Sequence, residues 1–287
     1  MKYLLILISA IGLFGCKGAD EQIPAYIYIK PFGLTTTTEQ GSASSSITEG
    51  WVYVNQEFVG AYSLPAIVPF LSNGQTRITI FPGVHENGLA EYPNIYDFYQ
   101  QFEVNKVVKP AKVDTLKPNT TYYPNTAFAS VENFEASNSF TVKTASVGGK
   151  MTLSNVGAFE GKACGLMKLQ VKDTIYATSV GSVNVMKNIL NNGSPSYVEL
   201  NYNSDVDIEV GMNGIDKNTG QETYQSVAFF KGKKEWRKIY VNLRSVIFDN
   251  RYSAYRLVLS ASLPIVNGKV SQDAGEARFD NIKVVYR

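Results

Sequence analysis

Apolar and polar residues alternate along most of this chain, which is the pattern of a half-buried β-strand. The alternation is clear at residues 26–29, at residues 76–81 and across residues 198–210. Glycine, proline, asparagine and serine separate these runs, and we find no convincing helix of normal length between them. The sequence therefore predicts an all-β protein.

Composition limits the number of domains and the classes of partner. With 44% hydrophobic and 18% charged residues, the 287 residues are sufficient for two folded cores. The formal net charge is +2, and the densest basic cluster, Lys231, Lys233 and Lys234, has Glu235 beside it. Such a cluster is typical of a solvated turn, so nucleic acid is not expected as a partner.

The first residues carry the most specific motif. After a charged start, residues 3–14 form an apolar stretch too short to span a bilayer, and Gly15 precedes Cys16. This run resembles the bacterial lipobox, in which the signal is cut before a cysteine that then receives lipid and an acyl chain such as palmitate. The resemblance implies a signal peptide over residues 1–15 and a lipid anchor on Cys16. An ordinary cleaved signal with an incidental cysteine is the alternative.

Residues 16–24 are mostly small or charged, and we expect them to form a tether. The acidic pair Asp20 and Glu21 resembles the surface-export signal of outer-membrane lipoproteins of the Bacteroides type. Lys17 is not the aspartate associated with retention at the inner membrane. The resemblance therefore implies the outer membrane, with either face open, and the lipid as the membrane anchor.

The remaining cysteine and the single histidine argue against several kinds of active site. Lipidation of Cys16 leaves Cys164 without a disulfide partner, and Cys164 leads into an apolar strand, so a buried structural thiol is expected. His85 lies in a turn-rich segment and is the only histidine. A zinc site and a histidine-dependent triad are both disfavoured. The sequence has no nucleophile motif, phosphate loop or metal-ligand cluster, so we expect no enzyme and no required cofactor.

The first half of the mature chain, residues 25–117, has the pattern of a small β-sandwich. A hairpin is predicted at Asn55 and Gln56, and Pro82 with Gly83 marks a later turn. This series is similar to the PEGA-like modules of cell-envelope proteins, which implies an Ig-like sandwich that serves as a spacer or binding platform. Prolines and asparagines in residues 118–129 predict a linker.

The second half, residues 130–287, contains an opening Phe134-Glu135, a strand led by Trp236, and a closing run at residues 279–282. These elements resemble jelly-roll carbohydrate-binding modules of the galactose-binding-like type, which implies a second β-sandwich. In many such modules acidic residues near the first and last strands help to hold a structural Ca²⁺, and Glu135 and Asp280 occupy the matching positions. A solvated Glu135 and a turn cap at Asp280 are the alternative.

Two groups of residues are candidates for glycan binding. Polar side chains alternate with apolar ones on one predicted strand face, which would place carboxylates and amides where sugar hydroxyls could bind. The members of this face are Glu199, Asn201, Asn203, Asp205, Asp207 and Glu209. An ordinary solvent face has the same pattern, and two carboxylates at suitable separation could also hydrolyse a glycoside.

The second group is aromatic. Tyr96 and Tyr99 belong to a cluster with Tyr92, Phe98 and Phe102, and clustered aromatic rings can stack on pyranose faces. The core of a sandwich has the same spacing. We therefore expect a non-catalytic, lipid-anchored envelope protein that presents a glycan-binding surface at the outer membrane. The alternatives are an accessory lipoprotein that binds a protein partner and, less favoured, a carboxylate-based glycoside hydrolase.

Overall fold

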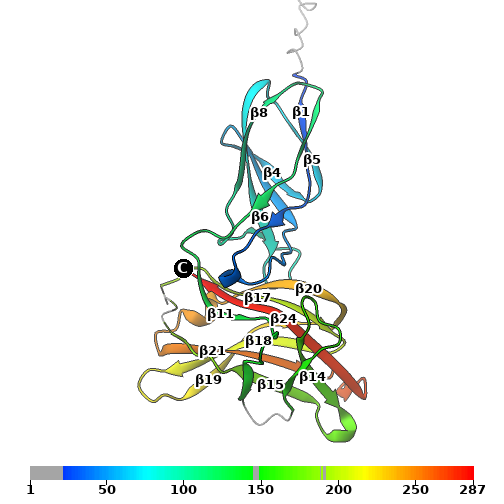
Figure 1. The fold of residues 1–287 in the computed structure, drawn as a ribbon, viewed down its shortest axis with the longest axis vertical. Coiled ribbons are helices and arrows are strands. Elements are labelled where there is room, and N and C mark those ends of the chain that lie inside the picture. Colours follow the sequence, from blue (N-terminus) through cyan, green and yellow to red (C-terminus); the bar gives the residue numbers. More distant parts are fainter. Residues whose placement is uncertain (1–21, 145–148, 188, 190–191) are drawn as a thin grey trace, which may run out of the picture.

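The computed structural model describes residues 22–144, 149–187, 189 and 192–287. The predicted signal peptide, Cys16 and most of the predicted tether lie outside this range. Strands dominate the described chain and are arranged in two modules, one standing on the other (Figure 1). In these ranges the helical elements are the single turn α2 (Arg244–Ile247) and two short 3-10 turns, and none of them is long and apolar enough to cross a membrane. The all-β prediction is confirmed.

The first module consists of three small sheets. One sheet has the order β5 (Ala66–Phe70), β1 (Ala25–Ile29) and β9 (Val113–Leu116). The largest has the order β4 (Glu57–Ser63), β3 (Glu49–Val54), β6 (Gly74–His85) and β7 (Pro93–Ile95), with β8 (Phe102–Val108) also paired to β6. Strands β2 (Gly33–Leu34) and β10 (Asn119–Thr120) form the third.

The hairpin predicted at Asn55 and Gln56 connects β3 to β4. Both turn residues have positive φ, at 50° and 74°, which is the requirement of the tight turns that match the twist of paired strands. Glutamine thus occupies a left-handed position that favours glycine. The chain thus forms the predicted turn with glutamine at its second position.

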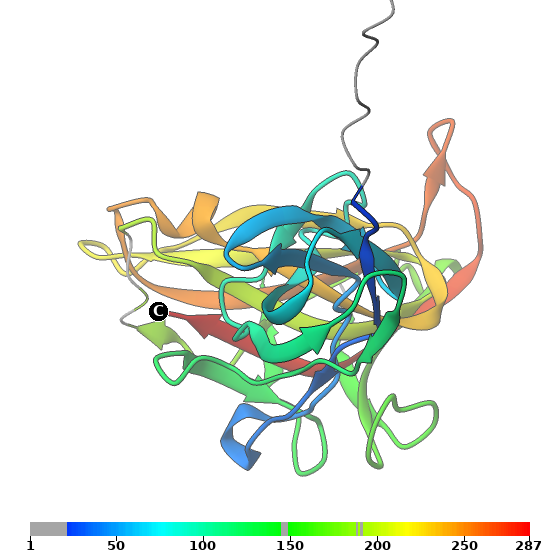
Figure 2. The same cartoon turned by 90° about the horizontal axis from the view of Figure 1, so that it is seen from above.

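The second module is a sandwich of two six-stranded sheets. The sheet nearer the first module, here called the proximal sheet, has the order β13 (Met151–Ser154), β14 (Cys164–Gln170), β24 (Ala274–Tyr286), β17 (Ser196–Ser204) and β20 (Lys233–Asn242), with β11 (Ala127–Glu132) beside β24. The distal sheet has the order β12 (Phe140–Lys143), β15 (Ala177–Ser182), β21 (Tyr252–Ser262), β18 (Asp207–Asp216) and β19 (Glu222–Phe230), with β16 (Met186–Lys187) beside β21. A small hairpin of β22 (Ile265–Val266) and β23 (Lys269–Val270) projects from its side (Figure 2).

The core of this sandwich is built by the alternation that the sequence shows. Val198 and Leu200 from β17, and Ile208 and Val210 from β18, are buried between the two sheets. The side chains between them in sequence point to the outer faces. The proximal sheet therefore presents its outer face to the first module, and the distal sheet presents its outer face away from it (Figure 1).

The apolar core of the first module extends onto the outer face of the proximal sheet. Tyr197 and Tyr240 of the proximal sheet pack with Tyr96 and Tyr99 of the first module. The segment predicted as a linker is not a free connection, because its residues form β10, contribute buried Tyr122 to this core and enter β11. This packing fixes the first module against the proximal sheet.

Cys164 is a free cysteine, fully buried at the start of β14. Burial raises the pKa of its thiol from the ordinary 9.0 to about 11. In a chain without Cys16, we expect native protein to react with iodoacetamide at pH 8 about a hundredfold more slowly than urea-unfolded protein, because two pKa units lower the thiolate fraction by that factor. Mass spectrometry of timed samples measures both rates. Equal rates would contradict the buried position.

Candidate functional site

Tyr96 and Tyr99 are not available to a ligand. Each side chain is 1% exposed, and their rings meet edge to face with centroids 4.6 Å apart. The prediction that these rings stack on sugar is wrong, since they form the core that joins the modules. The alternative stated from sequence, a sandwich core, is the observed one.

Glu199 and Asn201 do lie on the outer face of β17, but the first module covers that face. Glu199 is fully buried, and its carboxylate accepts hydrogen bonds from the Tyr96 hydroxyl at 2.7 Å and the Tyr122 hydroxyl at 2.8 Å. The ammonium of Lys238 lies 3.3 Å from the same carboxylate. The prediction of a ligand-binding role for Glu199 is wrong because alternation identifies the face of a strand and not what covers that face. Asn201 lines a hollow at the edge of this junction, so its ligand-binding role stays a prediction.

Burial at this junction changes the acidity of its charged groups. It raises the pKa of the Tyr96 and Tyr122 hydroxyls, with the negative charge of Glu199 acting in the same direction. It lowers the pKa of the Lys238 ammonium and lowers that of Lys283 to about 8, in both cases against the attraction of Glu199. Glu199 is thus the central anion of a buried polar network between the modules.

The two carboxylates proposed for Ca²⁺ accept backbone hydrogen bonds instead. Glu135 accepts from the amides of Lys162 and Ala163 at 2.7 and 3.1 Å. Asp280 accepts from the amides of Phe159, Glu160 and Asn281. Within the described ranges, no group of three or more His, Cys, Asp or Glu residues could hold a metal ion. The structural Ca²⁺ site stays a prediction.

Asp207 and Glu209 lie on the outer face of the distal sheet, which no other module covers. Asp207 is nearly buried and pairs with the Lys231 ammonium at 2.9 Å. Glu209 is partly exposed and lines an open cleft of about 660 Å³. Of the six residues predicted on the polar face, Glu209 is the one that lines this cleft.

The cleft runs across the outer surface of five strand segments that are distant in sequence. Its polar lining consists of Lys143, Thr144, Thr178, Ser179, Glu209, Asn213, Glu222, Tyr224, Ser260 and Ser262. The hydroxyls of Thr144 and Ser179 are 2.8 Å apart, and the Ser260 hydroxyl donates to Ser179 at 3.0 Å. Three strands thus place a row of hydroxyls on one floor.

Two glycines make this floor flat. A Cβ atom at Gly211 would overlap the ring of Tyr224, so the ring lies directly against the backbone of β18. At Gly181 a Cβ atom would meet Cδ of Arg256 at 2.6 Å, so that side chain also crosses the sheet closely. Tyr224 remains 43% exposed. The result is an exposed aromatic ring laid along the sheet surface.

Polar groups held by hydrogen bonds lie beside this ring. Glu222 accepts from Arg256 at 2.9 Å and from the Asn213 amide at 2.8 Å, and these hydrogen bonds lower its pKa. The Oδ1 atom of Asn213 is buried and has no hydrogen-bond partner among the described residues. Burial, together with a hydrogen bond to Glu209, raises the pKa of the Tyr224 hydroxyl, so this group stays neutral at physiological pH. The cleft therefore combines a neutral aromatic ring with fixed polar groups.

Tyr224, Gly211 and the hydroxyl row were not predicted from the sequence, because their grouping depends on strand register. Tyr224 pairs with Asn213 across β18 and β19, and Ser260 pairs with Ser179 across β15 and β21. These pairings join residues from separate parts of the chain.

A scan against protein-family models and a search of curated proteins give no match. The solved structures include similar ones. The C-terminal family 22 carbohydrate-binding module of Clostridium thermocellum Xyn10B is 15% identical, with a TM-score of 0.37, over 55% of this chain and 94% of that one. The CBM22-2 xylan-binding domain from Paenibacillus barcinonensis Xyn10C is 14% identical, with a TM-score of 0.40, over 55% and 99%. At such values these likenesses carry no information about a ligand for this chain.

Proposed function

We propose that this protein is a non-catalytic, lipid-anchored envelope protein that presents a glycan-binding cleft on the outer face of its distal sheet. The observation that carries the proposal is the exposed ring of Tyr224, held flat over Gly211 next to Glu209. An aromatic face packs well against the C–H face of a pyranose ring. An open site that crosses several strands suits a polymer of neutral sugars.

The polar groups of the cleft match sugar hydroxyls. Glu209 can accept from hydroxyls, and the Asn213 Oδ1 atom needs a donor that the described protein does not supply. The hydroxyls of Ser179 and Ser260 can both donate and accept. A neutral saccharide offers both kinds of partner along its length.

The charges in the cleft favour binding over hydrolysis. A glycosidase needs one carboxylic acid that remains protonated near neutral pH and one ionised carboxylate. The lowered pKa of Glu222, held by Arg256, keeps it ionised. Asp207, the other carboxylate considered from sequence, is paired with Lys231 and does not line the cleft. This arrangement supports a site that holds glycan without turnover.

The arrangement of the modules is compatible with an anchor at Cys16. Strand β1, the first strand of the described chain, lies at the end of the first module farthest from the distal sheet (Figure 1). A lipid placed before it would leave the cleft facing away from the membrane, with the first module as a spacer. The proposed outer-membrane location rests on the lipobox resemblance together with this geometry.

A glycan array and affinity electrophoresis of the chain without residues 1–21 test the proposed function. We expect retention by neutral polysaccharides and no release of reducing sugar. Failure to bind any glycan, together with recovery of one defined envelope protein by crosslinking in cells, would instead support the accessory lipoprotein. Release of reducing sugar that is lost in Glu209→Gln would make the protein a hydrolase.

A further inference from the structure

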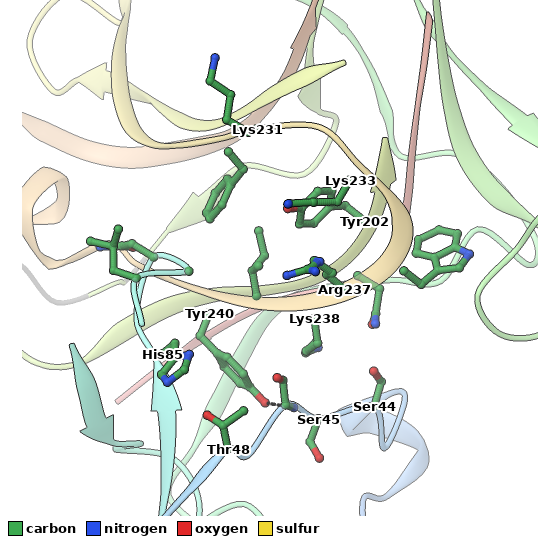
Figure 3. Close-up of a pocket in the computed structure, with 18 of the residues that line it drawn as sticks. Ser44, Ser45, Thr48, His85, Tyr202, Lys231, Lys233, Arg237, Lys238 and Tyr240 are labelled. Carbon is green, nitrogen blue, oxygen red and sulfur yellow. Dashed lines mark hydrogen bonds between the residues drawn. The ribbon is translucent and has the colours of Figure 1, made fainter. Parts of the chain in front are cut away.

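A second hollow lies where the edge of the sandwich meets the first module, and it shares no lining residue with the cleft of the distal sheet (Figure 3). It has a volume of about 610 Å³. Its walls come from residues 44–48 before β3, from residues 85–89 after β6, and from the β19–β20 hairpin. Both modules are therefore needed to form this junction groove.

Among the described residues, every charged side chain that lines the junction groove is basic. They are Lys231, Lys233, Arg237 and Lys238. The acidic partners of two of them are almost fully buried behind the wall: Asp207 is 8% exposed and Glu199 0%. The groove surface is consequently positive and favours an anion.

Lys233 and Arg237 are the cations best placed to meet a ligand. They pair with Ser204 and Tyr202 of β17 on either side of a register shift, so they leave the same face of β20, and Figure 3 shows both side chains extending in the same direction. Both are exposed, and the guanidinium of Arg237 pairs with Glu235, which does not line the groove. Their spacing allows two cations to act on one carboxylate.

A further sign of a ligand is a buried polar atom. The Asn201 Oδ1 atom belongs to a groove-lining residue that is 1% exposed, and it has no hydrogen-bond partner among the described residues. Asn201 faces Lys238 across β17 and β20, and the Lys238 ammonium is paired with Glu199 at 3.3 Å. A buried acceptor left in this way calls for a donor from a ligand or an ordered water.

The groove also offers an apolar surface and neutral hydroxyls. Trp236 and Phe159 meet edge to face with centroids 5.6 Å apart, and Phe159 is 40% exposed. Ser44 and Ser45 line the opposite wall (Figure 3). A ligand with an anionic group, an apolar ring face and several hydroxyls would use all three kinds of surface.

We infer that the junction groove binds an acidic saccharide, with the carboxylate of a uronic acid residue between Lys233 and Arg237 and neighbouring sugar residues along the aromatic and hydroxyl surfaces of the groove. A peptide strand fits less well. Although β20 is the edge strand of its sheet, Asn87 already occupies that edge by donating to the Tyr240 carbonyl at 2.8 Å and accepting from the Asn242 amide at 3.0 Å. This site is separate from the cleft for neutral glycan and goes beyond the proposed function.

Titration calorimetry of the chain without residues 1–21 tests this inference, with an oligogalacturonide and a neutral oligosaccharide of equal length as probes. We expect the double variant Lys233→Gln/Arg237→Gln to bind the oligogalacturonide about tenfold more weakly. The matched control is Lys168→Gln/Lys234→Gln, which removes two exposed charges outside the groove and should leave the affinity unchanged.

Three results would overturn the inference: no binding of the oligogalacturonide, an equal loss in both double variants, or equal binding of polyglutamate. The last two would show attraction to charge alone or to an acidic peptide. Tyr224→Ala separates the two sites, because it should weaken the neutral oligosaccharide and leave the oligogalacturonide unaffected. Failure of one site is thus distinguishable from failure of the other.

Discussion

Replacement of Glu199 by alanine is expected to lower the free energy of unfolding by about 3–5 kcal/mol, the usual cost of breaking a buried ion pair by removing one partner. The change leaves the Lys238 ammonium buried without its counter-charge. It also leaves the Tyr96 and Tyr122 hydroxyls without their acceptor. Urea unfolding followed by tyrosine and tryptophan fluorescence measures the loss.

Glu103→Ala is the matched control, because Glu103 forms an ion pair with Arg77 on the exposed surface of the first module. An exposed pair contributes about 0–1 kcal/mol, so this variant should unfold close to the wild type. Glu199→Gln keeps an acceptor and loses the charge, and it should lie between the two. If Glu199→Ala unfolds like the control, the network does not join the modules.

Tyr224→Ala is expected to weaken binding of neutral glycan at least about tenfold, since it removes the ring that forms the apolar floor of the cleft. The ring is 43% exposed, so stability should change little. Calorimetry with the best oligosaccharide from the array measures the affinity. Gly211→Ala should act in the same direction, because its methyl group would displace the Tyr224 ring from the sheet.

The control for this prediction is Tyr92→Ala. Tyr92 is 62% exposed on the first module and lines neither the cleft nor the junction groove. It should bind as the wild type does. Equal affinity of wild type and Tyr224→Ala, with both folded, would contradict a role for the Tyr224 ring in glycan binding.

The strands and their faces could be predicted from local pattern because alternation is a property of consecutive residues. Val198 and Leu200 indeed point into the core, and Glu199 points to the other face, as the sequence predicts. The sequence did not reveal that the first module buries Glu199. Burial of an outer face depends on how two modules pack, and no single strand carries that information.

The candidate site illustrates the same difference. Glu209 could be predicted because its own strand places it on the outer face of the distal sheet. Tyr224 and Ser179 could not be selected, because their meeting depends on the register of β18 with β19 and of β15 with β21. Gly211 carries no side chain to suggest a role, and its effect appears once the Tyr224 ring lies over it.

A nuclear magnetic resonance titration with the bound neutral oligosaccharide tests the central claim most directly. If neutral glycan binds in the cleft of the distal sheet, we expect saturable shifts of the backbone amides around Ser179, Gly211, Tyr224 and Ser260, which surround the cleft. Amides at the junction groove, such as that of Trp236, should not move. Saturable shifts confined to any other surface, with the distal-sheet amides unchanged, would contradict glycan binding in this cleft.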